Sequence, residues 1–300
     1  MHRKLWLAVL SLLLLLVLAA CGGDRQESSG GNGESSEETA DRSGNGATSE
    51  KVLIFARGGD SQSLDYASTQ DGESSRVTLQ IYESLLRFDE HSFEVKPHLA
   101  ESWEVSEDGL HYTFKLREGV KFHDGTDFNA EAVKINFERW ADPDHPYSFK
   151  EDGYAYSVYG NQFGGYKGDE GHLIKEINVI NDYEIEFVLT RPFGAFLQNM
   201  AMSYFAITSP AALEKYGPAI NENPVGTGPF KFVSWTKNDS IVLEKFEDYW
   251  MYGYPLLDKV IFQVIPDNSA RLTALRAGDI DLMDGLNPDD YHIVKDEPGL

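Results

Sequence analysis

The stretch LAESWEVSEDGLHYTFKLREGVKFHDG, residues 99–125, contains the most regular pattern in the chain. Apolar side chains at positions 110, 112, 114 and 116 alternate with polar ones at 111, 113, 115 and 117. Successive side chains of a strand point to opposite faces of a sheet, so this alternation predicts a strand with one buried face. Asp124-Gly125 predicts a turn at the end of the stretch.

Further strands are expected where short apolar runs are bounded by turn residues. They cover residues 52–56, 110–116, 174–179, 183–189, 230–235, 241–245, 260–265 and 279–283. Two pairs of these strands form hairpins, one around Asn181-Asp182 and one around Asn238-Asp239.

Helices are expected where a capping residue precedes apolar residues at helical spacing. Proline in the first position and glycine after the last one strengthen two of these predictions. The expected helices are residues 80–88, Asn129 to Asp142, Ser209 to Gly217, and Asn268 to Gly278. Because strands and helices are interleaved, we expect an α/β fold with mixed sheets, arranged in two lobes.

The amino-acid composition excludes several classes of partner and site. The 300 residues include 26 Lys and Arg against 49 Asp and Glu, which gives a net charge of −23 and argues against a nucleic-acid partner. A hydrophobic fraction of 41% argues against wholesale disorder. Cys21 is the single cysteine, which excludes an intramolecular disulfide framework and multi-cysteine metal sites.

The N-terminus has the pattern of an export signal. Arg3 and Lys4 precede an apolar run over residues 5–20, which is shorter than the ~20 residues of a membrane-spanning helix. An uncleaved membrane anchor is the alternative. Residues 18–21, Leu-Ala-Ala-Cys, resemble the lipobox of bacterial lipoproteins, which implies cleavage of residues 1–20 and lipidation of Cys21. Residues 21–50 are rich in Gly, Ser and Glu, and we expect a disordered tether.

Five blocks of the remaining chain resemble one family. They are residues 61–65 (SQSLD), 99–125, 223–230 (NPVGTGPF), 248–250 (DYW) and 265–282. In this order they are similar to the family 5 extracellular solute-binding proteins, which are oligopeptide, dipeptide and nickel receptors of ABC importers. The resemblance runs from about Lys51 to the end of the chain.

The resemblance implies a two-lobed fold like that of class II periplasmic binding proteins. Residues 51–266 are then the first lobe, with an inserted subdomain at about 90–205. Residues 267–300 are the crossing segment and the start of a second lobe, which is largely missing from this chain. The implied protein is a lipid-anchored receptor on the extracytoplasmic face of a bacterial cell membrane, or in the periplasmic space. It is not an enzyme and has no cofactor; it captures peptides and delivers them to a membrane permease and its ATPase by lobe closure.

The candidate ligand-binding residues form four groups. Asp71 could meet a ligand amine, the tyrosines offer apolar area with a hydroxyl, and the backbone amides of the glycine loop could meet a carboxylate. The alternatives are a solvated loop for the first group, local packing for the tyrosines, and a tight connection into the strand at Phe230 for the glycines. The groups are Gln70 and Asp71; Tyr147 and Tyr154; Gly226 and Gly228; and Asp284, Gly285 and Asn287.

Other functions remain open at this stage. The same fold can bind a nickel chelate, a sugar or an opine, and a one-lobe surface interaction or sensor module without transport is also possible. Ser234 and Lys237 match a serine-acylase pattern but lack its companion motifs. No metal site is predicted. The acidic residues Asp279, Asp281 and Asp284 do not match a calcium-binding EF-hand loop, because Met283 stands where such a loop needs an oxygen ligand.

Overall fold

The computed structural model describes residues 50–298, which belong to one compact unit of residues 48–300. The predicted export signal, the lipidation site Cys21 and the tether up to residue 49 lie outside the described residues.

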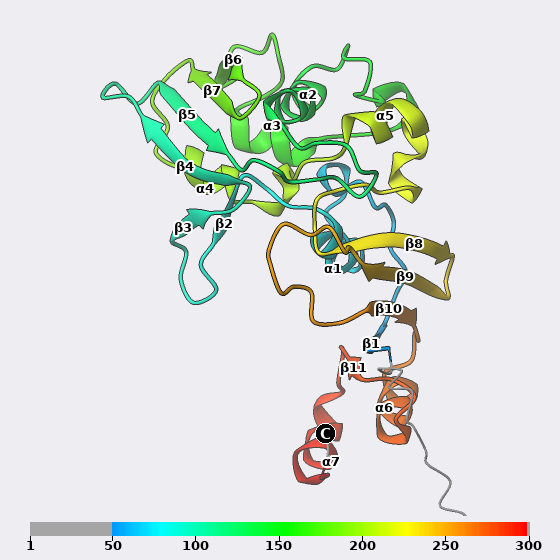
Figure 1. Cartoon of the computed structure of the whole chain (residues 1–300). Helices are drawn as coiled ribbons and strands as arrows, with labels where there is room; N and C mark the ends of the chain where they lie inside the picture. The colour runs from blue at the N-terminus through cyan, green and yellow to red at the C-terminus, as the bar shows by residue number, and fades with distance from the viewer. Residues whose placement is uncertain (1–49, 299–300) are drawn as a thin grey trace, which may run out of the picture. The chain divides into compact units, whose positions relative to one another are not determined.

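The first sheet has five strands in the order β11-β1-β10-β9-β8 (Figure 1). They are β1 Val52–Arg57, β8 Phe230–Thr236, β9 Ser240–Lys245, β10 Lys259–Val264 and β11 Leu282–Met283. β1 runs parallel to both β10 and β11, whereas β9 is antiparallel to β8 and β10. The sheet is therefore mixed, as the sequence predicts.

The second sheet is antiparallel, with four strands in the order β4-β5-β7-β6. They are β4 Ala100–Val105, β5 His111–Leu116, β6 Ile174–Asn181 and β7 Glu184–Leu189. On β5 the apolar positions are buried, and His111 and Lys115 are exposed, which confirms the predicted one-faced strand. A short hairpin of two strands, β2 Leu86–Phe88 and β3 Val95–Pro97, lies in the chain between β1 of the first sheet and β4 of the second.

Seven α-helices and five 3-10 turns connect the strands in residues 50–298. The helices are α1 Gly72–Ile81, α2 Ala130–Ala141, α3 Ser157–Phe163, α4 Phe196–Met200, α5 Pro210–Tyr216, α6 Asn268–Ala277 and α7 Tyr291–Asp296. The 3-10 turns are η1 Tyr66–Ser68, η2 Lys150–Asp152, η3 Ser203–Phe205, η4 Gly217–Glu222 and η5 Pro288–Asp290.

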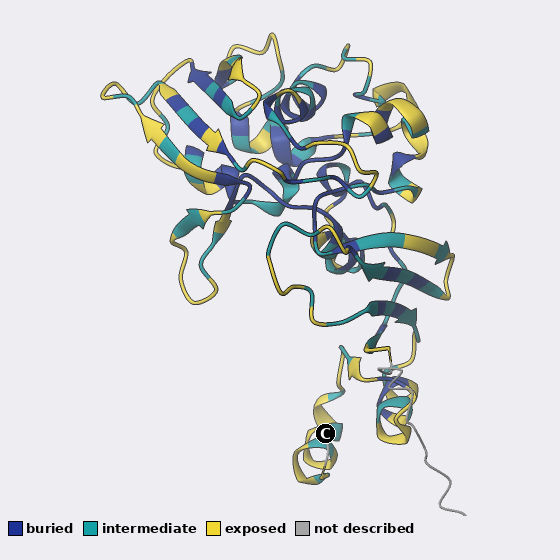
Figure 2. Ribbon diagram, viewed as in Figure 1, coloured by how far each residue is buried: buried dark blue, intermediate teal, exposed yellow. Residues whose placement is uncertain are grey.

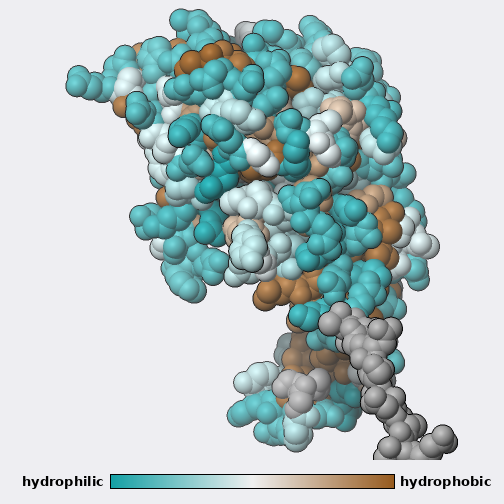
Figure 3. All heavy atoms as spheres, in the orientation of Figure 1, coloured by the Kyte–Doolittle hydropathy of each residue, from teal (hydrophilic) through white to brown (hydrophobic). Residues whose placement is uncertain are grey.

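Two main cores stabilise these layers (Figure 2). The larger packs α2, α3 and α4 on the four-stranded sheet through edge-to-face aromatic contacts, for example Phe137 with Phe187 at 4.9 Å between ring centroids. The smaller packs Val77 and Ile81 of α1 against Leu243 and Phe262 of the five-stranded sheet. Hydrophilic residues predominate on the face drawn in Figure 3, in keeping with the acidic composition.

The predicted helix caps are largely confirmed. The Asn129 side chain accepts a hydrogen bond from the Ala132 N–H at the start of α2. Ser209 caps α5 in the same way, with Pro210 in the first turn and Gly217 after the last. Gly278 ends α6 with a positive φ of 76°. The cap of α6 is Asp267, however, and not Asn268, because the Asp267 carboxylate reaches the Ala270 N–H.

The helix predicted over residues 80–88 is wrong. α1 begins at Gly72, where Asp71 caps it, and ends at Ile81. The backbone is extended at Tyr82, with φ −119° and ψ 152°, and β2 begins at Leu86. The apolar positions fit a helical period, but the chain leaves the helix and buries the carboxylate of Glu83 among residues from other segments.

One prediction near the C-terminus also needs correction. The strand expected over 279–283 pairs with β1 only at Leu282–Met283, because the Asp281 carboxylate accepts a hydrogen bond from the Ile54 N–H at 2.8 Å just before it.

Candidate functional site

The three parallel strands β1, β10 and β11 end at one edge of the five-stranded sheet. In open α/β sheets, ligands bind outside the carboxyl ends of parallel strands. Three of the predicted ligand-binding residues, Asp284, Gly285 and Asn287, follow β11 at this edge. The edge is therefore the first candidate site, and contact of these three residues with a ligand stays a prediction.

Arg271 of α6 holds the loops at this edge together. Its Nη1 donates hydrogen bonds to the carbonyls of Ile265 and Pro266, and its Nε donates to the carbonyl of Asp284 at 3.1 Å. Arg271 is only 2% exposed. Gly285 has a φ of +67°, and a Cβ atom there would lie 2.5 Å from Arg271 Nη2. Glycine at 285 therefore leaves room for the guanidinium.

Charges of both signs meet at the same edge. Arg76 of α1 forms ion pairs of 2.7 Å with Glu73 and with Asp284. Arg57 is fully buried, lies 3.2 Å from Asp60, and has its pKa lowered by that burial. Neighbouring carboxylates and guanidinium groups can pair with the amine and the carboxylate of a small zwitterion.

Asn287 is engaged within its own loop. Its Oδ1 accepts a hydrogen bond from Asn268 Nδ2 at 3.0 Å, and its Nδ2 donates to Asp290 at 3.0 Å. These contacts fix the backbone after β11. Contact of Asn287 with a ligand stays a prediction.

Gln70 and Asp71 lie just before α1, between β1 and the helix. Asp71 caps α1 by accepting a hydrogen bond from the Ser74 N–H at 2.8 Å, and it also accepts from Thr69 Oγ1 at 2.6 Å. Partial burial raises the pKa of Asp71, but these hydrogen bonds outweigh it and the pKa is lowered. Gln70 Nε2 donates to Ser157 Oγ at 2.8 Å and so joins this loop to α3.

The two predicted tyrosines, Tyr147 and Tyr154, precede α3, the helix that Gln70 contacts through Ser157. Tyr154 donates its hydroxyl hydrogen to the carbonyl of Pro218 at 2.6 Å and accepts from the Asn221 N–H at 3.2 Å. Burial raises the pKa of Tyr154, so the hydroxyl stays protonated. Tyr147 packs beside Phe149, with 6.3 Å between ring centroids.

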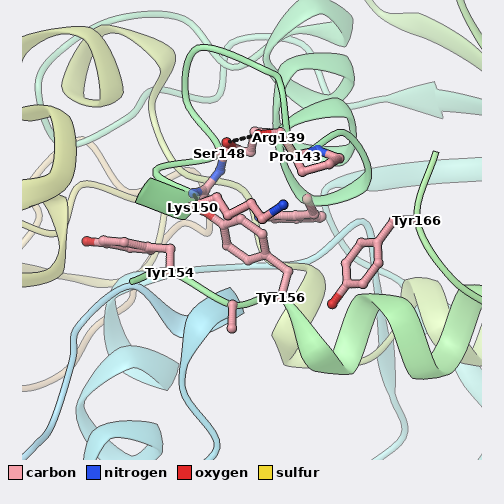
Figure 4. A pocket seen from close by; sticks show the side chains of 9 residues that line it. Arg139, Pro143, Ser148, Lys150, Tyr154, Tyr156 and Tyr166 are labelled. Carbon is pink, nitrogen blue, oxygen red and sulfur yellow. Dashed lines mark hydrogen bonds between the residues drawn. The ribbon is translucent and has the colours of Figure 1, made fainter. Parts of the chain in front are cut away.

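Tyr154 is also part of the wall of a cavity of about 200 Å³ (Figure 4). The cavity lies between the end of α2, the loop after it and the segment that leads into α3. In Figure 4, Lys150 and Tyr156 lie on one side of it and Tyr166 on the other. Its lining is Arg139, Trp140, Pro143, Ser148, Lys150, Tyr154, Ala155, Tyr156 and Tyr166. Of the two predicted tyrosines, Tyr154 therefore lines a cavity and Tyr147 does not.

Gly226 and Gly228 pack against the end of α1. A Cβ atom at Gly226 would lie 2.1 Å from the carbonyl oxygen of Ile81, and one at Gly228 would lie 2.7 Å from that of Gln80. The Gly228 N–H donates to the Ile81 carbonyl at 2.9 Å. Close backbone approach accounts for both glycines. Their contact with a ligand carboxylate stays a prediction, although the amide of Gly228 is already used.

Sequence reasoning missed the buried charges of Arg139 and Glu83. Arg139 of α2 makes two hydrogen bonds of 3.0 Å to the carboxylate of Asp65, and both side chains are at most 1% exposed. Glu83 accepts hydrogen bonds from three side chains. The available signal was large apolar residues close to each charge, with Trp140 next to Arg139 and Leu85-Leu86 two residues after Glu83.

The acylase alternative finds no support in the geometry. Lys237 pairs with Glu222 at 2.9 Å and lies over the Trp235 ring, and within residues 50–298 it makes no hydrogen bond to Ser234. In the same residues no group of three or more His, Cys, Asp or Glu side chains could hold a metal ion. No helix of that part of the chain is long and apolar enough to cross a membrane.

Solved structures with the same fold define the class of this protein. It matches DppA of Helicobacter pylori, an ABC transporter-associated periplasmic binding protein in complex with the peptide STSA, with a TM-score of 0.75 and 39% identity. This match covers 82% of the present chain and 49% of DppA. NikZ of Campylobacter jejuni, in complex with Ni(L-His), matches with a TM-score of 0.66 and 28% identity over 82% of this chain and 45% of NikZ. The fold is that of a class II periplasmic binding protein, as the sequence predicts.

Sequence comparison identifies the family. Residues 94–300 match the model of bacterial extracellular solute-binding proteins, family 5. The glutathione-binding protein GsiB is 36% identical over 229 residues in Pectobacterium atrosepticum and 38% identical in Escherichia coli K12. The chain belongs to the family 5 bacterial extracellular solute-binding proteins. It spans 41% of the length of these GsiB relatives, and each match covers 76% of the present chain.

Proposed function

We propose that the protein is a receptor of an ABC importer that captures short peptides. The observation that carries the proposal is the edge formed by β1, β10 and β11, where the partly exposed side chains of Arg76 and Asp284 present charges of both signs to any ligand outside the sheet. A short peptide is a zwitterion and matches such an edge. The relatives support this choice, since GsiB is a glutathione-binding protein and the DppA structure contains a peptide.

Lobe closure is the proposed mechanism. Residues 51–266, with an insert at about 90–205, act as the first lobe, and residues 267–300 lead toward a second. A peptide in the cleft stabilises the closed state by its differential affinity for that state. The proposed ligand-facing set keeps the residues predicted from sequence: Gln70, Asp71, Tyr147, Tyr154, Gly226, Gly228, Asp284, Gly285 and Asn287.

The proposal includes a lipid anchor at Cys21 on the extracytoplasmic face of the membrane. The pattern at residues 18–21 and the polar segment after it support this location. An anchored receptor stays close to the permease and ATPase that accept its ligand. Replacing Cys21 with Ser is expected to release the protein from the membrane fraction into the soluble fraction, and retention in the membrane fraction would contradict the anchor.

Peptide capture is tested on the protein as it occurs in the cell. We would purify it from native membranes, denature it, and identify the released small molecules by mass spectrometry. Released short peptides, together with lost uptake of radiolabelled peptide in a deletion strain, are the expected results. Unchanged uptake in the deletion strain would overturn the transport function.

A different ligand on the same fold is the second candidate. The solved relatives NikZ, in complex with Ni(L-His), and AgaA, in complex with agropinic acid, support it. Release of a nickel chelate, a sugar or an opine, in place of peptides, would favour this candidate.

A further inference from the structure

The cavity shown in Figure 4 has walls made largely of aromatic rings. Trp140, Tyr154, Tyr156 and Tyr166 contribute them, from α2, from the segment before α3 and from the loop after it. A volume of about 200 Å³ is below the roughly 300–1,000 Å³ of drug-sized ligand pockets. The cavity therefore suits a single planar group and not an entire peptide.

The Tyr166 ring packs in this wall directly against Gly160, which has no side chain in its way. A Cβ atom at Gly160 would lie 3.0 Å from Cζ of Tyr166 and 3.1 Å from its hydroxyl oxygen. The ring of Tyr166 also stacks on Tyr159, with an interplanar angle of 22°. The wall opposite Lys150 is therefore a packed surface, and a methyl group at position 160 would move it.

Two cations line the cavity, and one of them is already compensated. The Arg139 guanidinium makes two hydrogen bonds of 3.0 Å to Asp65 and donates to the Tyr156 hydroxyl at 2.8 Å. Arg139 is fully buried in this network. Its charge is therefore not available to a further anion.

Lys150 is the uncompensated cation. Within residues 50–298 its amine forms no ion pair and no hydrogen bond, and its neighbours Glu151 and Asp152 do not pair with it. An ammonium ligand would gain cation–π contacts with the rings but would meet Lys150 and Arg139 in the same cavity. A planar group with a negative charge meets the rings and the free amine without that repulsion.

We propose that this cavity binds an aromatic carboxylate, with the ring between the tyrosines and the carboxylate at Nζ of Lys150. Two sources have this chemistry, a free aromatic acid and the C-terminal aromatic residue of a short peptide. The peptide source rests on the proposed function. In that case the cavity selects peptides that end in an aromatic residue.

Calorimetric titration of the full chain tests the site with 3-phenylpropionate. Hexanoate keeps the charge without the ring, and 3-phenylpropionamide keeps the ring without the charge. We expect 3-phenylpropionate to bind at least about tenfold more tightly than either, the ratio that one hydrogen bond to a charged group supplies. Equal affinities for the three compounds, or no binding of 3-phenylpropionate, would overturn the proposal.

Two variants test the residues. Lys150→Gln removes the charge from an exposed side chain and should weaken 3-phenylpropionate about tenfold, while 3-phenylpropionamide is unaffected. Lys115→Gln, at an exposed position of β5, is the matched control and should change neither. Gly160→Ala should weaken both ring-bearing compounds, with its melting curve as a check on folding. Unchanged affinity in Lys150→Gln would contradict the site.

The dipeptide Ala-Phe and its C-terminal amide separate the two sources. Ala-Phe binding that depends on Lys150 supports a peptide source. Binding of 3-phenylpropionate without binding of Ala-Phe supports a free acid, so that the cavity stands while its peptide source fails. Peptide binding that Lys150→Gln leaves unchanged sustains the proposed function and overturns the peptide source of the cavity ligand.

Discussion

Glu83 connects several segments of this chain through one carboxylate. It is 5% exposed and accepts hydrogen bonds from Thr227 Oγ1 at 2.7 Å, Tyr249 at 2.7 Å and Trp250 Nε1 at 2.9 Å. His98 Nε2 lies 3.2 Å from it. Thr227 and the pair Tyr249-Trp250 belong to two of the five family blocks, and His98 immediately precedes a third. A structural carboxylate therefore explains part of the sequence resemblance.

Replacing Glu83 with Gln should destabilise the protein by about 3 kcal/mol, because an amide NH₂ then faces hydrogen-bond donors in a buried site. Urea unfolding at neutral pH, followed by circular dichroism, measures the change. Glu104→Gln, at an exposed position of β4, is the matched control and should have almost no effect. Equal unfolding midpoints for the two variants would contradict this role of Glu83.

His123 predicts a pH dependence of stability. Burial lowers its pKa from 6.5 to about 4, against a smaller opposing effect of its hydrogen bond to the Gly228 carbonyl. A lowered pKa means that the unfolded chain binds the proton more readily. Stability from this residue is therefore complete above about pH 6.5 and is lost as the pH falls toward 4, by on the order of 3 kcal/mol.

Urea unfolding at several pH values between 7 and 4 measures this loss. A His123→Gln variant lacks the titrating group, so its stability should fall less steeply than that of the wild-type protein over the same range. Identical slopes for the two proteins would show that other groups cause the acid sensitivity.

At the scale of elements, α2 contributes several of the buried side chains of the larger core. Its cap residue Asn129 accepts a hydrogen bond from Ala132 N–H at 2.9 Å. The helix then buries Val133, Phe137 and Trp140 on one face. Sequence spacing predicted this helix and its limits because the cap, the period and the terminating Asp142-Pro143 all agree.

Asn129→Ala should lower the free energy of unfolding by about 1 kcal/mol, since one N–H at the helix start loses its acceptor. Asn129→Asp retains an acceptor and serves as the control. Thermal melts of the two variants against wild type measure the effect, and an unchanged melting temperature in Asn129→Ala would contradict the cap.

At the scale of the described unit, the Asp65–Arg139 pair joins its two sheet regions. Asp65 precedes η1, in the connection that leaves β1 of the five-stranded sheet, and Arg139 lies on α2 against the four-stranded sheet. Although burial opposes it, the Asp65 carboxylate raises the pKa of Arg139. Arg139 therefore stays charged in the interior.

Arg139→Met leaves the Asp65 carboxylate buried without its partner and should cost about 3–5 kcal/mol of stability. The double variant Asp65→Leu with Arg139→Met removes both charges and should recover most of that loss. Urea unfolding of the single and double variants gives the coupling between them. Additive losses in the double variant would show that the two residues act independently.

The candidate site was predictable only in part. Asp284 and Gly285 follow a strand, so sequence could place them at a sheet edge, and the aromatic stretch with Tyr154 does surround a cavity. The use of Asp71 as a cap and of Gly226 against Ile81 required the structure. The extended backbone at Tyr82 could not be read from local spacing, because the partners of Glu83 lie more than a hundred residues away in sequence.

The sequence by itself determined the family and the elements with clear local signals, such as β5, α2 and the two predicted hairpins, because periodicity, caps and turn residues are local and the five blocks occur in order. Only the tertiary structure decided which charges are buried and paired. Glu83, Arg139 and Arg271 find their partners across long stretches of chain, and burial makes such pairing necessary. The free amine of Lys150 beside the aromatic cavity likewise emerges only when α2, the loop after it and the start of α3 come together.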